Sequence, residues 1–407
     1  MIRFSFLLLF SFTSIVDAQL LSQRLKVPSE VLERPHELLI YTPPSYHFDA
    51  QQQYPVLYLM DGEYNFNYVT GLVELWSNIS PRFPEMIVVG ISGYDSDYYR
   101  HLMRPNWDKE GKPSENGAAN LMIQAIIEEI EPSVAKAFRT SEFKILSGHS
   151  MGGLFTTYAA FTEPDAFNHY LAISPSLWWQ EQTLKHVVGE QLKKSVPKTN
   201  LLMSLGNEKG MGVHGFLDVV EAQRFEGLNF NFKHFPVESH GSVGLPTYEW
   251  ALGQIFADYK LEERYFDGEQ AVVEYAQRLR KAYGDVMPVN AAFLRNSCYA
   301  NCPGEPKDLM KLDQVLSKNF PHDAAFFQVL VAKHKINQKE YGEAKKWLEK
   351  AAKKAPDYFE LQHAWYLWHH QQGHDKKAEQ SLIKTKQLIE KSDLRQWQIN
   401  ELNLPLK

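Results

Sequence analysis

Cysteine is almost absent from this sequence: the 407 residues include only Cys298 and Cys302. A scaffold held together by several disulfides is therefore excluded, and two sulfurs alone do not make a zinc site. A bridge between the two cysteines needs an irregular turn, because residues four apart on a regular helix are badly placed for an S–S bond. Pro303 and Gly304 favour such a turn, so a disulfide and two free thiols both stay open.

The sequence also lacks an excess of basic residues and has few long hydrophobic runs. Lysine and arginine number 43 against 49 acidic residues, and the formal net charge is −6, which argues against a nucleic-acid partner. The apolar run at residues 4–16 is about 13 residues long, whereas a membrane-spanning helix needs about 20. We therefore expect no membrane insertion of the mature protein.

The first 18 residues have the pattern of a secretory signal. Arg3 supplies a positive charge ahead of the apolar run, and residues 16–18 place short side chains where a signal peptidase reads the chain. This pattern predicts a signal peptide over residues 1–18 with cleavage before Gln19. The mature protein is then expected to be periplasmic or secreted.

Apolar residues make up 44% of the sequence, which is enough for a large core and a second domain. Short apolar segments alternate with longer amphipathic ones from about residue 30 to 260, including a helical pattern over 118–138. We expect strands over 36–41, 55–60, 86–91, 143–146, 170–173, 200–205 and 231–237. Apolar strands with intervening helices predict an α/β domain over residues 19–262, with a mostly parallel sheet covered on both faces.

The remaining residues, 263–407, predict a smaller all-α domain. A period of about 34 residues pairs Ala344 with Ala378 and Leu348 with Leu382. This pattern resembles the tetratricopeptide repeat, in which small residues let the two helices of a hairpin approach closely. We expect such repeats around residues 324–390, and an irregular helical bundle is the alternative.

The clearest chemical motif is Gly-His-Ser-Met-Gly at residues 148–152. An apolar segment at 143–146 precedes it, and a helix-compatible segment at 153–161 follows it. A G-x-S-x-G between a strand and a helix is typical of the nucleophile elbow of α/β-hydrolases, in which the turn lifts the serine hydroxyl above the sheet edge. The motif therefore predicts Ser150 as a catalytic nucleophile.

A serine nucleophile needs a base, and in this fold the histidine follows the serine in the chain. His240 stands in the loop 238–242, directly after the expected strand at 231–237. His234 lies inside that strand, and His149, beside the serine, is expected to point away from the site. We therefore predict His240 as the base.

The acid of a triad falls between the serine and the histidine in this fold. Glu208 follows the expected strand 200–205 and is the leading candidate, while Asp218 and Glu221 on the next helical segment are alternatives. A Ser–His pair without an acid is a further possibility. The oxyanion needs backbone donors, for which we predict the amides of Met151 and Glu63. No metal, nucleotide or other cofactor is implied.

Four segments together resemble a known family: residues 54–62, 148–153, 173–179 and 238–242. They are similar to the esterases that include enterochelin and salmochelin esterases, bacterial feruloyl esterases and mycolyltransferases. The Ser-Pro-Ser-Leu-Trp-Trp stretch at 174–179 is especially like the siderophore-esterase branch. The resemblance covers about residues 25–260 and implies an α/β-hydrolase fold. By motif it assigns the nucleophile, base and acid to Ser150, His240 and Glu208, and the oxyanion amides to Glu63 and Met151.

One segment departs from that family. Members often carry Arg-Asp-Leu-Thr-Pro after the third strand, whereas residues 100–105 read Arg-His-Leu-Met-Arg-Pro here. Loops carry substrate choice in such enzymes, so Arg100 is a candidate pocket residue. Trp178 and Trp179 are candidates for the wall of a pocket for a flat acyl group, and core packing of at least one of them is the alternative.

These observations predict an exported serine esterase that hydrolyses carboxylic esters through an acyl-enzyme. An acyltransferase on the same fold is one alternative, and a helical-repeat binding protein with a silent hydrolase domain is another. The expected partner is a small-molecule ester: a siderophore lactone, a feruloyl or acetylated sugar ester, or a short acyl ester. Homodimerisation or protein binding through the C-terminal helices stays open.

Overall fold

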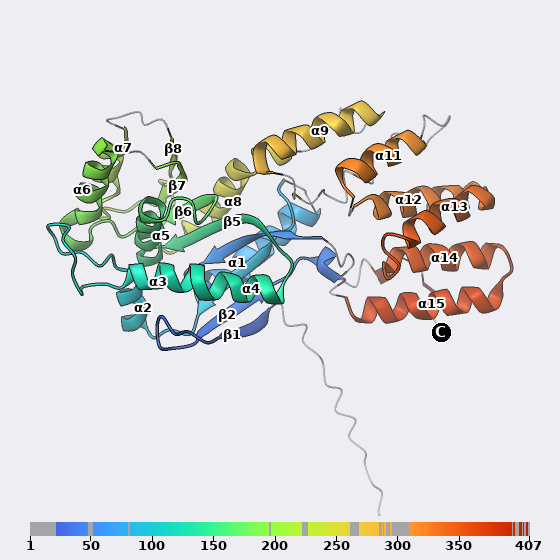
Figure 1. The fold of residues 1–407 in the computed structure, drawn as a ribbon, viewed down its shortest axis with the longest axis horizontal. Coiled ribbons are helices and arrows are strands. Elements are labelled where there is room, and N and C mark those ends of the chain that lie inside the picture. The colour runs from blue at the N-terminus through green and yellow to red at the C-terminus, as the bar shows by residue number, and fades with distance from the viewer. Residues whose placement is uncertain are drawn as a thin grey trace, which may run out of the picture.

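An eight-stranded sheet forms the centre of the molecule (Figure 1). The computed structural model describes residues 22–47, 52–79, 82–194, 197–221, 227–260, 268–284, 309–321 and 323–392, together with a few single positions. The expected signal peptide, Cys298, Cys302 and the expected domain boundary after residue 262 lie outside the described residues.

The sheet is mostly parallel, as predicted. Its order is β1-β2-β4-β3-β5-β6-β7-β8, with β1 and β2 antiparallel to their neighbours and the other pairs parallel. The strands are β1 (Gln23–Val27), β2 (His36–Tyr41), β3 (Tyr54–Leu59), β4 (Ile87–Ser92), β5 (Thr140–His149), β6 (His169–Ile173), β7 (Thr199–Leu205) and β8 (Leu228–His234). β1 is absent from the predicted strands, because Val27 is its only buried residue and it carries no apolar run.

Helices cover both faces of the sheet, which explains why every residue of β3 and β4 is buried. One face packs against α1 (Gly62–Glu74) and α8 (Gly244–Ile255). The other face packs against α2 (Ser96–Met103), α3 (Ala119–Ala125), α5 (Met151–Thr162), α6 (Trp179–Lys194) and α7 (Val213–Glu221).

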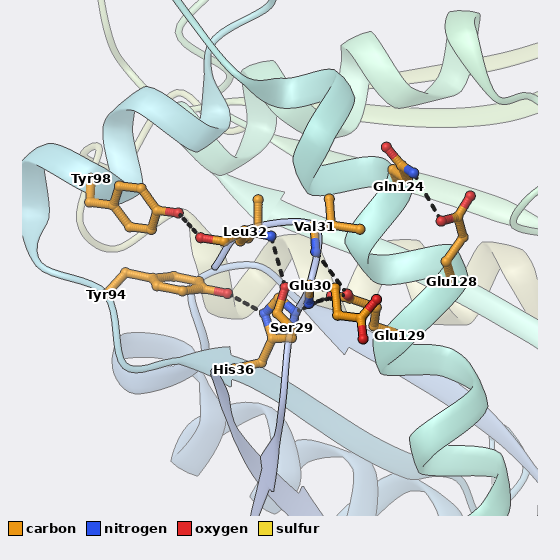
Figure 2. Close-up of polar contacts among 10 residues, drawn as sticks. All are labelled: Ser29, Glu30, Val31, Leu32, His36, Tyr94, Tyr98, Gln124, Glu128 and Glu129. Atoms are coloured by element: carbon orange, nitrogen blue, oxygen red, sulfur yellow. Dashed lines mark hydrogen bonds and ion pairs between the residues drawn. The ribbon is translucent and has the colours of Figure 1, made fainter. Parts of the chain in front are cut away.

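The helix expected over 118–138 contains a π-helical segment. This segment (Ile126–Ile130) lies between α3 and α4 (Glu131–Ala137). It presents Glu129 to the loop between β1 and β2, where one carboxylate oxygen accepts the amides of Glu30 and Val31 at 2.7 and 3.0 Å (Figure 2). The other oxygen lies 3.0 Å from Nε2 of the fully buried His36. A single carboxylate therefore ties the edge of the sheet to the helical layer.

The negative charge of Glu129 contributes to this contact between the sheet edge and the helical layer. Burial alone would raise the pKa of Glu129, but hydrogen bonds from Ser29, Val31, His36 and Glu30 outweigh it and lower the pKa to about 2. A carboxyl whose pKa is lower in the folded than in the unfolded protein stabilises the fold above its ordinary pKa. That contribution is lost as the pH falls toward 2.

The described segments of the C-terminal region that have regular secondary structure are all helices, as predicted. It contains α9 (Gly268–Tyr283), α11 (Leu309–Asn319), α12 (Ala324–Asn337), α13 (Tyr341–Ala352), α14 (Phe359–Gln371) and α15 (Asp375–Glu390). The pairs α12–α13 and α14–α15 form hairpins at the end of the molecule away from α6 and α7 (Figure 1). Tyr341 and Asp375 begin the second helix of each hairpin 34 residues apart, and Ala344 and Ala378 are buried. The assignment to tetratricopeptide repeats stays a prediction.

The helical region shares a hydrophobic core with the sheet. One continuous cluster runs from the α1–α8 face through α9 to the hairpins. Phe256, at the end of α8, packs on Phe143 of β5 at a ring-centroid distance of 5.5 Å. Tyr275 of α9 donates to the Tyr259 carbonyl at 2.9 Å and packs against Phe320. Within the described ranges, no helix has the length and hydrophobicity needed to cross a membrane.

Replacing Glu129 by alanine is expected to lower the free energy of unfolding by about 2 kcal/mol, because two amides and a buried imidazole lose their partner. Denaturant titration followed by circular dichroism measures this change. Glu128→Ala is the matched control, since the Glu128 side chain is exposed and contacts Gln124 on its own helix at 2.9 Å. Equal losses in the two variants would contradict the role given to Glu129.

Candidate active site

Ser150 stands in a sharp turn between β5 and α5, as the motif predicts. Its backbone has φ 58° and ψ −110°, a left-handed conformation that is strained for a residue with a side chain. The Ser150 amide donates to the Ile173 carbonyl at 2.9 Å, and the Ser150 carbonyl accepts the amides of Leu154 and Ser176 at 3.0 and 2.9 Å. These bonds hold the turn against β6 and the following loop.

The two motif glycines are required for different reasons. A Cβ on Gly148 would lie 2.3 Å from the Gly152 carbonyl oxygen, so the turn itself leaves no room. A Cβ on Gly152 would lie 2.6 Å from an Asp61 carboxylate oxygen and 2.9 Å from the Tyr99 hydroxyl. The second glycine is therefore required by side chains that pack beneath the turn.

The predicted base and acid are in contact. Nδ1 of His240 lies 2.5 Å from Oε2 of Glu208, and their side chains are 41% and 11% exposed. The alternative acids Asp218 and Glu221 are exposed on α7, and His234 is exposed at the end of β8. Of the candidates weighed from the sequence, the structure brings His240 and Glu208 together.

Ser174 contacts the predicted acid and is absent from the predicted site residues. Its hydroxyl donates to Oε1 of Glu208 at 2.7 Å and accepts the Gly206 amide at 3.1 Å. Its backbone φ of 35° lies in the left-handed region. Its position directly after β6, at the edge where the catalytic loops gather, is the sequence signal that identifies it.

His149 contacts the predicted base, His240, and the expectation that it points away is wrong. The rings of His149 and His240 lie 4.5 Å apart with an interplanar angle of 35°. Ser147 and His149 share a face of β5 because side chains alternate along a strand. That face is the one on which Ser147 contacts Tyr248 of α8 at 2.6 Å, and the His240 loop leads into α8.

The His149 ring is neutral at pH 7. Burial, and then the proximity of His240, lower the pKa of His149 to about 4. Its Nε2 is buried without a hydrogen-bond partner among the described residues. The ring therefore packs against the base without adding a charge to it.

The hydroxyl of Ser150 lies 3.2 Å from the hydroxyl of the buried Ser176. The predicted oxyanion residues stand in the first turns of two helices, Glu63 in α1 and Met151 in α5. First-turn amides have no acceptor within their own helix, and the positive end of the helix dipole favours an anion there.

Asp61 is a further site residue, absent from the predicted ones. Its Oδ2 accepts the His149 amide at 2.6 Å, and its Oδ1 accepts the Tyr99 hydroxyl. Burial raises the pKa of Asp61 to about 6, although hydrogen bonds from Tyr99 and His149 and the nearby His240 lower it in part. A carboxyl directly after a fully buried strand, at the catalytic edge, is the sequence signal for it.

The expected pocket residues lie in different environments. Trp179 is buried in the core, so the alternative of core packing applies to it. Trp178 is 50% exposed and stays a pocket candidate. Arg100 is exposed on α2. Among the described residues, no group of three His, Cys, Asp or Glu side chains is placed to hold a metal ion.

Large apolar side chains remain exposed on the segments that carry the catalytic groups. Tyr64 adjoins Glu63, Trp178 follows Ser176, and Val237 and Leu245 flank His240. These four side chains are 87%, 50%, 88% and 50% exposed, respectively. We call this set, Tyr64, Trp178, Val237 and Leu245, the apolar rim. Exposed apolar groups near a site are typical of surfaces that bind a ligand or partner.

Comparisons with known proteins find esterases among the relatives of this chain. Residues 29–211 match the esterase family described as "Putative esterase". The chain is 29% identical over 224 residues to ferri-bacillibactin esterase BesA of Bacillus subtilis, which is 47% of this chain and 74% of BesA. It is 28% identical over 140 residues to siderophore triacetylfusarinine C esterase of Aspergillus fumigatus, which is 32% of this chain and 47% of that protein. These matches confirm the prediction of a carboxylic ester hydrolase.

A solved structure shares the fold. An IroE-like serine hydrolase from Shewanella oneidensis has a TM-score of 0.60 and 24% identity to this chain, and the match covers 75% of this chain and 99% of that one. The predicted α/β-hydrolase fold with a following all-helical region is thereby confirmed.

Ser174→Ala is expected to lower kcat about tenfold, because it removes a hydrogen bond to the Glu208 carboxyl. Steady-state kinetics on a p-nitrophenyl ester measures the change. Ser92→Ala is the control, since Ser92 is also a buried serine with one bond, to the Glu37 carbonyl at 2.9 Å. An unchanged kcat in Ser174→Ala would exclude this serine from orienting the acid.

The raised pKa of Asp61 predicts that the stability of the protein depends on pH. Its pKa is about 6 in the folded protein against an ordinary value of 3.8, so the folded state holds the proton more tightly. This contribution is present below pH ~4 and is lost as the pH rises through about 6. Denaturant titrations should show that the wild type loses stability relative to Asp61→Asn between pH 4 and 7. A difference that does not vary with pH would contradict the raised pKa.

Proposed function

We propose that this chain is a serine esterase in which Ser150, His240 and Glu208 form the catalytic triad. The observation that carries the proposal is the 2.5 Å contact between His240 and Glu208. The His240 ring packs on His149, the residue before Ser150, which stands in a strained strand–helix turn. A base oriented by a third group, next to an activated nucleophile, is the general arrangement for covalent acyl transfer.

The chemistry follows from the free nitrogen of the base. Because Nδ1 of His240 faces Glu208, Nε2 is left to take the Ser150 proton as Oγ attacks the ester carbonyl. The amides of Glu63 and Met151 stabilise the oxyanion. The C–O bond then breaks, the alcohol leaves with the proton from His240, and water hydrolyses the acyl-enzyme by the same steps. The Ser150 hydroxyl turns from Ser176 to His240 for the attack, since catalytic hydrogen bonds often tighten only when substrate is bound.

For the substrate, we propose an ester of the siderophore type with a large flat or apolar acyl part. Two similar proteins are named as esterases of ferri-bacillibactin and of triacetylfusarinine C. The apolar rim provides exposed apolar and aromatic side chains for such a group, on the segments that carry the proposed catalytic residues. An acyltransferase differs only in the acceptor, and product analysis with added alcohols distinguishes it.

We also propose that the protein is exported by the segment 1–18 and that the C-terminal hairpins are tetratricopeptide-like. Their shared core with the sheet supports a role as a fixed part of the esterase more than as a separate binding module. Dimerisation or partner binding through these helices would use their outer faces. The 2.5 Å contact between the expected base and acid argues against a silent hydrolase domain.

Ser150→Ala and His240→Ala are each expected to lower ester hydrolysis by ~10⁴-fold or more, as the loss of a triad member does. A fluorophosphonate probe with intact-mass analysis and peptide mapping should label Ser150 in the wild type and not in His240→Ala. His234→Ala is the matched control and should keep full activity. Hydrolysis that survives in Ser150→Ala would overturn the proposed function.

A further inference from the structure

The two predicted oxyanion donors belong to segments far apart in the sequence. Glu63 follows β3, and Met151 follows β5. Two amides stabilise one oxyanion only when their separation and direction are set before the reaction. Some contact must therefore hold the start of α1 at a constant position relative to the start of α5.

Asp61 makes that contact. Its backbone carbonyl accepts the amides of Tyr64 and Asn65 at 3.2 and 3.0 Å, which joins it to the first turn of α1. Its carboxylate accepts the His149 amide at 2.6 Å, one residue before Ser150. The bonds run from the turn that carries Glu63, through one side chain, to the turn that carries Met151.

The carboxylate is also held sterically. The Cα of Gly152 lies against it so closely that any Cβ there would be 2.6 Å from the carboxylate oxygen. On the other oxygen, the Tyr99 hydroxyl donates from α2. The Asp61 carboxylate is thus bonded by one backbone amide and one phenol, and Gly152 packs against it.

We propose that Asp61 is a positioning residue for the oxyanion hole, whose carboxylate sets the distance between the amides of Glu63 and Met151. This inference rests on the proposed esterase function and adds a residue outside the triad to it. Keeping a carboxyl buried at this place has a stability cost, which a purely structural position could avoid with an apolar side chain.

A charge effect is the competing explanation, because Asp61 lies near enough to His240 for the two to interact electrostatically. The Asp61→Asn variant distinguishes the positioning effect from the charge effect. An asparagine keeps an oxygen for the His149 amide and an amino group for the Tyr99 oxygen, but it removes the charge. Asp61→Ala removes both the charge and the contacts.

The experiment compares kcat and KM of both variants on a p-nitrophenyl ester, per active site counted by fluorophosphonate labelling taken to its end point. We expect Asp61→Ala to lower kcat about 100-fold, the size seen when one oxyanion donor is lost. Its KM should stay near the wild-type value, and affinity for a boronic acid that forms a tetrahedral adduct should fall in parallel with kcat. Asp61→Asn should keep most of kcat.

Glu85→Ala is the matched control. Glu85 is likewise a buried carboxyl with a raised pKa, bonded to Ser45 and Asn78, but it lies before β4 at the edge of the sheet opposite to the catalytic loops. The Glu85→Ala variant should be less stable than the wild type but keep the wild-type kcat per labelled site. If Asp61→Ala does not fold, Tyr99→Phe tests the inference instead, because it removes one of the hydrogen bonds that hold the Asp61 carboxylate. Its kcat is expected to be several-fold lower than that of the wild type.

Three results would overturn the inference while the wild type remains active. The first is an unchanged kcat in Asp61→Ala or, if that variant does not fold, in Tyr99→Phe. The second is an equal loss of kcat in Asp61→Asn and Asp61→Ala. The third is an affinity for the boronic acid that does not fall in parallel with kcat. Failure of the proposed function is a separate result, in which wild-type hydrolysis does not depend on Ser150.

Discussion

The left-handed backbone of Ser150 is the constraint on which the rest of the site depends. A residue held in this conformation costs about 1–3 kcal/mol and persists only where surrounding contacts enforce it. Here those contacts are the bonds to Ile173, Leu154 and Ser176 and the close approach of Gly148 to the Gly152 carbonyl. The buried strand before the turn and the buried helix after it supply the packing that keeps the turn in place.

The parallel sheet brings the other groups to the same edge. The carboxyl ends of β3, β5, β6 and β7 lie side by side, and Asp61, Ser150, Ser174 and Glu208 each follow one of these strands directly or within a few residues. His240 arrives from the loop after β8. Polar contacts then run along this edge, so that a change in one loop affects the geometry of its neighbour. In open α/β sheets, ligands bind outside this end of the strands for the same reason.

The helical region extends the core of the enzyme. Because one apolar cluster runs from the α1–α8 face through α9 to the hairpins, the esterase fold and the helices stabilise each other. The same face carries α8, which begins after the His240 loop and contacts β5 through Tyr248 and Ser147. The helices therefore support the layer next to the loop of His240, the proposed base, although they lie far from the site along the chain.

Local patterns in the sequence were sufficient for the α/β class, most strands and the strand–turn–helix around Ser150, and they made His240 and Glu208 the leading candidates for base and acid. These depend on side-chain alternation, glycine spacing and chain order, which neighbouring residues carry. Only the tertiary structure revealed β1, the ring of His149 against the base, and the contact of Asp61 with a backbone amide 88 residues away. That contact exists because β3 and β5 are neighbours in the sheet, and strand order arises from packing of the whole domain and has no local sequence signature.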